Sequence, residues 1–211
     1  MNTYPKIDTV FMRDINGTKK LIENQFRDPA VKYLKDCVWE FTEKIDGTNI
    51  RVMWDGHKVT FGGRTERAQI PAPLMNKLNE MFGGNINEEL FEQTFGDKEV
   101  ILFGEGYGPG IQKGGAYRKD VSFILFDVKI GEMWLERKDV EDIAKIFGID
   151  VVPVAFYGPI SAAVEYVKRK PITLIPDGTA QMEGLVGRTP AGLRDRRGER
   201  IIVKIKVRDF T

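Results

Sequence analysis

The sequence has few of the residues that build disulfides, metal sites or membrane spans. Its 211 residues include one cysteine, Cys37, and one histidine, His57. These cannot form an internal disulfide, and they are too few for a structural zinc site. No run of about 18 apolar residues predicts a membrane-spanning helix. The first residues lack the apolar segment of a secretory signal, so we expect a reducing, cytoplasmic environment.

The chain also lacks a large excess of charge of either sign. Lys and Arg total 32, against 31 for Asp and Glu. This balance excludes a uniformly basic protein, so a nucleic-acid partner would have to be bound by a local patch. Hydrophobic residues make up 42% and charged residues 30%, as in ordinary globular proteins. The length is enough for one domain with a sizeable core.

Patterns typical of short strands outnumber helical ones. Residues 1–36 are polar and predict an N-terminal arm with turns near Asn16 and Asp28. The expected strands are Cys37–Glu43, Ile50–Trp54, Lys58–Phe61, Glu99–Gly104, Val121–Ile130, Met133–Leu135, Val151–Phe156, Gln181–Gly187 and Arg200–Val207. The expected helices are Pro71–Phe82, Asn87–Phe95, Arg137–Phe147 and Ile160–Arg169. This order predicts a single α+β domain, 1–211, with antiparallel sheets flanked by helices.

One lysine stands in an unusual local sequence, Lys44-Ile45-Asp46-Gly47. It follows a predicted strand and precedes a turn, so its side chain can project into a cleft. Neighbouring cations would lower its pKa and make the free amine a nucleophile. The same pattern arises by chance in roughly one chain in twenty of this size. A solvated lysine before a turn therefore stays open as an alternative.

Two glutamates stand beside predicted strands. Glu105 follows an apolar strand and precedes a glycine-rich loop, where a carboxylate can bind ribose hydroxyls or a metal. Glu183 begins a later strand. Either could instead be an ordinary exposed side chain, with the loop glycines needed only for their backbone conformations. The loop contains neither of the common glycine motifs that bind phosphate.

The last strand alternates strictly, which places Lys204 and Lys206 on one face and Ile205 and Val207 on the other. An antiparallel strand with one wet face would show the same pattern. Two lysines on one face can also bind a polyphosphate, and they would lower the pKa of a nucleophilic lysine nearby.

In this order and spacing, the pieces resemble the collinear motifs of the covalent nucleotidyltransferases: ATP-dependent RNA and DNA ligases and mRNA capping enzymes. The matching segments are Lys44–Gly47, Phe103–Glu105, Phe123–Val128, Glu183–Gly184 and Lys204–Lys206. Thr48-Asn49 and Gly108–Lys113 resemble RNA ligases of the phage RNA ligase 2 and trypanosome editing type. The resemblance implies an ATP-grasp-like nucleotidyltransferase fold with ATP between two antiparallel sheets. We expect no appended OB fold or C-terminal helical domain.

The resemblance also implies an activity. Lys44 would attack the α-phosphorus of ATP and form a lysyl–AMP intermediate. AMP would then pass to a 5′-phosphate end, and a 3′-hydroxyl would displace it. The implied cofactors are ATP and Mg²⁺ or Mn²⁺. Lys204 and Lys206 would contact the α-phosphate and act with Lys44 in catalysis, and Glu183 would bind the metal through water.

The remaining nucleotide contacts are implied in the same way. Glu105 would bind ribose, and Glu43 would contact the adenine largely through its backbone. Asn49 would lie near the phosphate or metal, while Ile45 lies beside the nucleophile. Arg64 would contact ribose and the nucleic-acid phosphate, unless it is a surface arginine. Phe126 is expected to stack on adenine, with Phe123, Leu125 and Asp127 sharing the opposite strand face.

A basic segment at 188–200 is the expected nucleic-acid contact, because it carries five arginines against two carboxylates. RNA is the expected substrate, bound through its backbone, and the oligomeric state is open. Other activities remain open as well. They are a minimal DNA ligase, a capping guanylyltransferase, an adenylyltransferase with another acceptor, and a non-catalytic binding module. The presence of Lys44 weighs against a binding module, which needs no nucleophile.

Overall fold

The computed structural model describes residues 3–210, which fold into two compact units. One unit contains Asp46–Val152 together with the N-terminal residues through Pro5. The other contains Lys6–Ile45 and the residues from Pro153 onward. In the described part of the chain, no helix has the length and apolar character needed to cross a membrane.

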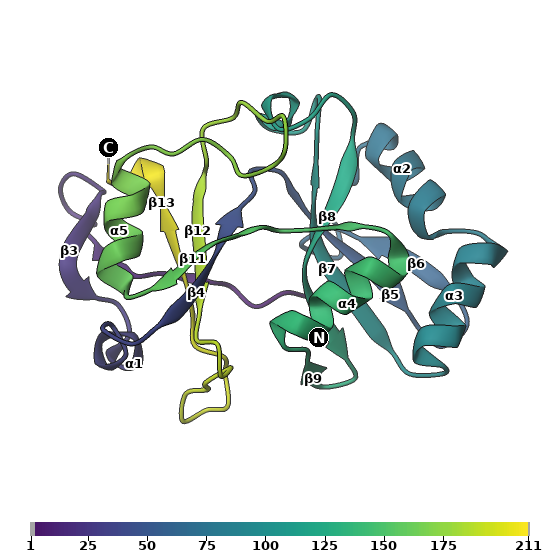
Figure 1. The fold of residues 1–211 in the computed structure, drawn as a ribbon, viewed down its shortest axis with the longest axis horizontal. Coiled ribbons are helices and arrows are strands. Elements are labelled where there is room, and N and C mark those ends of the chain that lie inside the picture. The colour runs from purple at the N-terminus through teal and green to yellow at the C-terminus, as the bar shows by residue number, and fades with distance from the viewer. Residues whose placement is uncertain (1–2, 211) are drawn as a thin grey trace. The chain divides into compact units, whose positions relative to one another are not determined.

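The first unit is built on a six-stranded sheet with the path β10-β8-β7-β5-β6, and β9 pairs with β8 (Figure 1). The strands are β5 (Thr48–Trp54), β6 (Val59–Gly62), β7 (Val100–Tyr107), β8 (Ser122–Ile130), β9 (Met133–Trp134) and β10 (Asp150–Val151). Its helices are α2 (Ala72–Phe82), α3 (Asn85–Phe95), α4 (Arg137–Phe147) and the short 3₁₀ turn Gly114–Ala116.

The two faces of this sheet differ. The side chains of Ile50, Val52 and Trp54 pack in one core with Leu74 from α2 and Phe91 from α3. Because side chains alternate along a strand, the intervening positions of β5 and β7 project from the opposite face. The candidate polar residues of this unit are therefore kept away from the helix-covered core.

A β-bulge in β8 changes the expected alternation. The register shifts where Phe103 pairs with Asp127 and the next residue, Gly104, pairs with Leu125. Phe126 is thus the extra residue, and the strand skips one step of its period. The sequence pattern predicted that Asp127 shares a face with Phe123 and Leu125. Because of the bulge, it lies on the opposite face. Those two lie in the helix-covered core, whereas Asp127 accepts a hydrogen bond from Tyr4.

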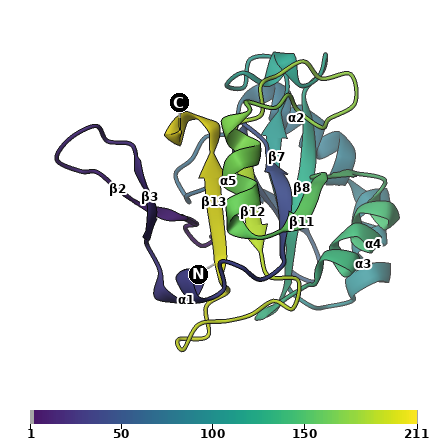
Figure 2. The ribbon, with the colours of Figure 1, turned by 60° about the vertical axis from the view of Figure 1, so that its left-hand side comes forward.

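The second unit is built on a five-stranded sheet in the order β1-β13-β12-β4-β11, with a separate β2–β3 hairpin. The strands are β1 (Asp8–Thr9), β2 (Phe11–Arg13), β3 (Leu21–Phe26), β4 (Trp39–Lys44), β11 (Val154–Gly158), β12 (Gly184–Arg188) and β13 (Ile202–Lys206). Its helices are α1 (Pro29–Tyr33), α5 (Ile160–Lys168) and the 3₁₀ turn Val207–Asp209. Figure 2 shows α5 lying along β13 and β12.

The core of this unit lies between the sheet and α5. Phe41, Leu185 and Ile205 from three neighbouring strands pack with Val164 and Val167 of the helix. Ile205 belongs to the apolar face of the last strand, as its alternation predicted. The opposite face of the same strands is left for Lys204 and Lys206.

The predicted fold class is confirmed as α+β, and most strand pairs are antiparallel. Two pairs are parallel: β1 with β13 and β10 with β8. Several boundaries also differ from the prediction. The predicted strand Val151–Phe156 is two strands, β10 and β11, which belong to different units and are separated at Pro153. Glu105 does not follow the end of its strand, because β7 continues to Tyr107.

The segment predicted as an N-terminal arm contains three short strands and a helix. Residues 1 and 2 lie outside the described part, but Asp8–Thr9 pairs with β13, and the next two strands form the β2–β3 hairpin. Asp28 caps helix α1 through a hydrogen bond from the Ala30 N–H, where we had expected only a turn. Polarity misled here because both sides of a short hairpin are largely exposed.

Candidate active site

Lys44 lies at the end of β4 and shares one carboxylate with Lys206. The Lys44 Nζ donates to Glu183 Oε2 at 2.7 Å. Lys206 donates to the other oxygen, Oε1, of the same carboxylate. All three side chains are partly buried, with Lys44 25% exposed and the other two 14%. The structure thus brings together three of the residues that the sequence singled out.

Strand register explains why these three residues meet. Gly184 is the pairing partner of both Lys44 on β4 and Lys206 on β13, so β12 ends between the two lysines. Glu183 directly precedes Gly184 and extends from the same end of the sheet. A side chain at Gly184 would not fit, because its Cβ would lie 2.1 Å from the Ile205 carbonyl oxygen. Close packing therefore explains why glycine follows Glu183 in this motif.

Electrostatics keep the Glu183 carboxylate ionised. Burial by itself would raise its pKa, because a charge is less stable away from water. The charges and hydrogen bonds of Lys44 and Lys206 outweigh this effect, and they hold the pKa of Glu183 below its ordinary value. In this state the carboxylate accepts the hydrogen bond that holds the Lys44 side chain in place.

Lys204 lies two residues before Lys206 on β13 and is half-buried. It therefore projects from the same face of the sheet. Its strand neighbours are Thr9 on β1 and Val186 on β12. The predicted pair of lysines on one strand face is confirmed, and this face is the one that also presents Lys44 and Glu183.

Glu43, just before the nucleophile, is a buried carboxylate with incomplete hydrogen bonding. Its Oε2 accepts from the Leu174 N–H at 2.7 Å. Its other oxygen, Oε1, has no hydrogen-bond partner among residues 3–210. Burial raises the pKa of Glu43, and hydrogen bonds from Thr173 and Leu174 offset this only partly. A buried acceptor without a donor is costly, so this position is suited to a ligand that donates. Ile45, on the other side of Lys44, is buried.

In the first unit, Asn49 and Glu105 are direct partners on neighbouring strands, β5 and β7. Residues paired in this way project to the same side of a sheet, with Cβ atoms roughly 5 Å apart. The side is the one away from the helices. The Asn49 Oδ1 atom is buried and has no hydrogen-bond partner in the described residues. The structure therefore brings this amide and this carboxylate together, as the family resemblance implied.

Arg64 is exposed on a loop that a buried arginine holds in place. The Arg51 side chain is 1% exposed, and its Nε donates to the Gly63 carbonyl at 2.8 Å. The Arg51 NH1 donates to Glu66 Oε1 at 3.0 Å. The loop approaches the guanidinium so closely that a Cβ on Gly62 would lie 2.8 Å from NH2. Arg51 thus fixes the backbone on both sides of Arg64.

Phe126 belongs to an aromatic cluster around Tyr4. The Tyr4 ring makes edge contacts with Phe103, Phe126 and Trp134, with ring centroids 5.1–5.5 Å apart. The Tyr4 hydroxyl donates to Asp127 Oδ2 at 2.7 Å. Phe126 is only half-buried, and the bulge separates it from the core-facing phenylalanine, Phe123. Its stacking on adenine remains a prediction.

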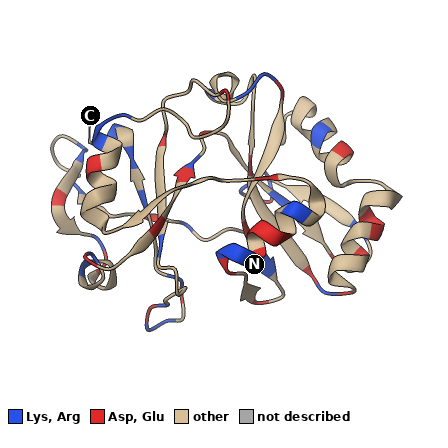
Figure 3. Ribbon diagram, in the orientation of Figure 1, with Lys and Arg blue, Asp and Glu red and all other residues tan. Residues whose placement is uncertain are grey.

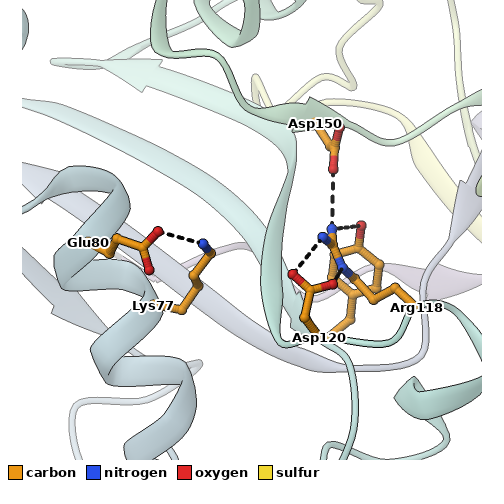
Figure 4. A network of polar contacts seen from close by, with 6 residues as sticks. Lys77, Glu80, Arg118, Asp120 and Asp150 are labelled. Carbon is orange, nitrogen blue, oxygen red and sulfur yellow. Dashed lines mark hydrogen bonds and ion pairs between the residues drawn. The ribbon is translucent and has the colours of Figure 1, made fainter.

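The glycine-rich loop after β7 is anchored by Arg118 (Figure 4). The guanidinium donates to both carboxylate oxygens of Asp120, at 2.9 and 3.1 Å. It also donates to the Tyr107 hydroxyl at 3.1 Å and to Asp150 at 3.4 Å. Partial burial opposes the charge, but the bonds to Asp120 and Tyr107 hold the pKa of Arg118 above its ordinary value.

This anchored loop also reaches the backbone that follows the nucleophile. The buried Tyr117 hydroxyl accepts from the Asp46 N–H at 3.3 Å. At the next residue, a Cβ on Gly47 would lie 2.3 Å from the Gly106 carbonyl oxygen. The Asp-Gly turn after Lys44 is therefore held by a hydrogen bond and by close packing, which explains the glycine of the motif.

In the part of the chain that is described, no three His, Cys, Asp or Glu side chains form a group able to hold a metal ion. A fully protein-bound metal site does not fit these residues. A single carboxylate such as Glu183 does fit a hydrated Mg²⁺, which keeps several waters and commonly binds through one or two carboxylates and substrate phosphates.

Comparison with known proteins assigns the family. The model of the RNA ligase family matches residues 38–206. The chain belongs to the RNA ligase family. The matched range includes every residue that the resemblance placed in the nucleotide site. No curated protein matches the chain in sequence.

Solved RNA ligases share the fold of this family member. A Naegleria gruberi RNA ligase variant with ATP and manganese has a TM-score of 0.64 and 18% identity, and the match covers 96% of this chain and 61% of that protein. A variant with AMP and manganese has a TM-score of 0.64 and 17% identity, and the match covers 96% of this chain and 61% of that protein. The ligase with pyrophosphate has a TM-score of 0.63 and 18% identity, with the same two coverages. This RNA ligase family chain therefore spans about three fifths of the length of these ligases.

Sequence reasoning missed the residues that position this RNA ligase family site. Arg51 has a detectable signal: a charged residue within an apolar strand, opposite the glycines of the Arg64 loop. Tyr117 has no signal of this kind, because its hydrogen bond to Asp46 spans 71 positions. Tyr4 carries no local signal, since its contacts depend on a bulge about 120 residues away.

Proposed function

We propose that the chain is an ATP-dependent RNA ligase and that Lys44 carries AMP as a covalent intermediate. The observation that carries the proposal is the shared Glu183 carboxylate between Lys44 and Lys206 at one end of the sheet. It occurs in a member of the RNA ligase family, at the positions the motifs predict. Similar ligase structures with ATP, AMP, pyrophosphate and manganese support these ligands.

The first step is a displacement at phosphorus. The Lys44 nitrogen bonds to the α-phosphorus of ATP, and the bond from that phosphorus to the bridging oxygen breaks. Pyrophosphate leaves with the oxygen, and the protons that the ammonium gives up pass to solvent. The amine attacks only as the free base, so its ion pair with Glu183 has to open first. Lys204 and Lys206 neutralise negative charge on the phosphate oxygens.

A divalent ion, Mg²⁺ or Mn²⁺, supplies further charge neutralisation at the phosphates when it is bound. Glu183 is the carboxylate that fits this role, through an intervening water. Glu183 would hold the hydrated ion, and it is also the carboxylate that holds Lys44 in the structure.

The incompletely bonded polar atoms suit the rest of the nucleotide. Glu43 contacts the adenine largely through its backbone, and Phe126 offers a ring face for stacking. Glu105 accepts hydrogen bonds from ribose hydroxyls. Asn49 uses its unpartnered Oδ1 near the phosphates or their hydrated metal. Arg64 contacts ribose and, later, the 5′-phosphate of the RNA.

The next two steps transfer AMP to RNA and join the ends. The 5′-phosphate of the RNA attacks the lysyl-linked phosphorus and the bond to Lys44 breaks. The 3′-hydroxyl of a second end then attacks the activated 5′-phosphorus, and AMP leaves. These displacements depend on positioning more than on acid–base chemistry. The arginines of segment 188–200 are the proposed backbone contact for the RNA.

The test is the mass of the intact protein after incubation with ATP and Mg²⁺, followed by sealing of a nicked RNA duplex. We expect an added AMP from ATP and none from GTP, and no adduct in Lys44→Ala. Pyrophosphatase should raise the yield, because it removes the product that reverses the step. Addition of GMP would indicate a capping enzyme. An adduct without sealing would leave an adenylyltransferase, and no adduct on protein freed of bound AMP would contradict the proposal.

A further inference from the structure

The loop between β12 and β13 presents arginines on a preformed turn. Figure 3 shows basic residues gathered along this loop, which we call the arginine hairpin (residues 189–201). The side chains of Arg194, Arg196 and Arg197 are exposed. With Arg188, Arg200, Asp195 and Glu199, segment 188–200 carries a net charge of +3 in a chain whose net charge is +1.

Asp195 gives the hairpin a defined shape. Its Oδ1 accepts from the Arg197 and Glu199 N–H groups, at 2.8 and 2.9 Å. The backbone closes the turn through Gly198 N–H to the Asp195 carbonyl at 2.9 Å. At the base, the Ile201 N–H donates to the Leu193 carbonyl at 3.0 Å. The arginines are thus carried by an ordered hairpin, which limits the entropy lost on binding.

Arg194, Arg196 and Arg197 make few contacts within the molecule. Arg194 donates to the Gly198 carbonyl, and Arg197 pairs with Asp195 at 3.0 Å on the surface. Within residues 3–210, the Arg196 side chain makes no hydrogen bond or ion pair. Exposed pairs of this kind contribute little to stability. The guanidinium groups remain able to bind phosphates, whose geometry they match.

The hairpin lies at the other end of its strands from the catalytic lysines. Gly184, next to Glu183, pairs with Lys206, whereas Arg188 pairs with Ile202. Four residues of strand separate these positions, which is roughly 14 Å at about 3.4 Å per residue. The hairpin begins beyond Arg188. Its arginines are therefore too distant to contact the phosphate that reacts at Lys44.

We propose that the arginine hairpin binds the sugar–phosphate backbone of the RNA substrate at least about four nucleotides from the ends being joined. A nucleic-acid strand presents one phosphate about every 3.4 Å along a duplex, so roughly 14 Å corresponds to about four phosphates. This inference rests on the proposed RNA substrate. Its consequence is a dependence on substrate length: the hairpin strengthens binding of long ends and is irrelevant for short ones.

The experiment compares RNA stem-loops that contain one nick with a 5′-phosphate. The stem on one side of the nick is varied between about four and about twelve base pairs while the other side stays long, and the two sides are then exchanged. The loop keeps the short stem annealed. The dissociation constant is measured by fluorescence anisotropy without ATP at several salt concentrations. The proteins are the native chain, the triple variant Arg194→Ala, Arg196→Ala, Arg197→Ala, and a charge-matched control. The control replaces three exposed lysines of the other unit by Ala: Lys58, Lys98 and Lys138.

We expect the triple arginine variant to bind the long substrate roughly tenfold or more weakly, with a salt slope smaller by about two to three units. Shortening the stem on one side should remove the difference from the native chain, and that side identifies the strand on which the hairpin lies. The matching Arg→Lys triple variant should recover part of the affinity, because it keeps the charge. The lysine control should show no length dependence.

Equal losses on long and short substrates, or no loss on either, would overturn the inference. AMP addition to Lys44 serves as the folding control, because it should be unchanged in the triple variant. It also separates the two proposals. If the native chain forms no adduct but the length-dependent binding appears, the proposed ligase activity falls and the hairpin assignment stands. If the adduct forms and the length dependence is missing, only the hairpin assignment falls.

Discussion

The two units prepare their polar groups in opposite ways. In the second unit, the reactive residues are paired with one another, and Lys44 and Lys206 share Glu183. In the first unit, Asn49 keeps a buried oxygen without a partner, and Arg64 is exposed on a loop that Arg51 holds. The ion cluster of the second unit is therefore satisfied internally, whereas Asn49 and Arg64 of the first unit have unused bonding capacity. Glu43 lies in the second unit outside the cluster, and it also keeps an unpartnered oxygen.

This difference indicates different energetic roles. A self-paired cluster stabilises the fold and has to be opened before reaction, so its residues contribute to stability as well as to activity. An unpartnered buried amide costs stability and is compensated only when a ligand binds. Mutations should therefore change stability and activity in the same direction at the ion cluster, and in opposite directions at Asn49.

Replacing Glu183 tests the ion cluster and should have the largest effect. Glu183→Gln keeps the size of the side chain but leaves two ammonium groups adjacent. We expect the maximal rate of AMP addition to fall by roughly 10² or more, since a preorganised charge is lost.

The measurement is the single-turnover rate of AMP addition, with Lys206→Met as the comparison. That variant leaves the Lys44–Glu183 pair intact, so its maximal rate should fall less. An unchanged maximal rate in Glu183→Gln would show that the cluster is only structural. The contrast between the units would then be broken.

Arg51 tests the scaffold that holds an exposed group in the first unit. Arg51→Met removes the donor to the Gly63 carbonyl and should destabilise the unit by about 2 to 3 kcal/mol, since a buried acceptor loses its partner. The transfer of AMP to RNA should slow, because the backbone around Arg64 is no longer fixed. The measurements are urea unfolding and single-turnover transfer. Glu66→Gln is the matched control: Glu66 is 78% exposed, so its loss should cost less than about 0.5 kcal/mol.

Asn49 gives the opposite sign. Asn49→Ala removes a buried oxygen that has no partner, so stability should stay the same or rise by up to about 1 kcal/mol. AMP addition should slow by about tenfold, because a bond made only with the ligand is lost. Urea unfolding and the single-turnover rate are compared for the same protein preparation. A joint loss of stability and activity would show that Asn49 is part of the packed scaffold.

The sequence was sufficient where a residue's role follows from local order. Strand alternation placed Lys204 and Lys206 on one face, and the motif order identified Lys44, Glu105 and Glu183 as candidates. The glycines beside them have local reasons that structure makes visible, such as the 2.1 Å approach at Gly184. Helices with a clear apolar face, such as Arg137–Phe147, were predicted to the residue.

The sequence was insufficient for side chains whose position depends on strand register or on pairing between distant strands. The bulge at Phe126 reversed the face of Asp127, and alternation alone contains no sign of it. Asp8–Thr9 gains its structure by pairing with the distant strand β13, and the polarity of this segment gives no sign of that pairing. Neither the sharing of Glu183 nor the anchoring by Arg51 could be derived without the pairing of strands that are far apart in the chain.

The smallest effect concerns two glutamates of the second unit with opposite pKa shifts. The pKa of Glu183 is lowered from 4.5, so its contribution to stability is complete above pH 4.5 and is lost as pH falls through its lowered value. The pKa of Glu43 is raised by burial, so its folded state favours the protonated form, and the cost of its charge grows as pH rises.

Glu43→Gln should therefore be more stable than the native chain near pH 7, and this advantage should shrink toward about pH 4. Glu183→Gln should be less stable near pH 7 and approach the native chain only below about pH 4. Urea midpoints over this range measure both differences. Parallel pH profiles for the two variants would show that the charge of Glu43 is solvated, and would leave its unpartnered oxygen without energetic consequence.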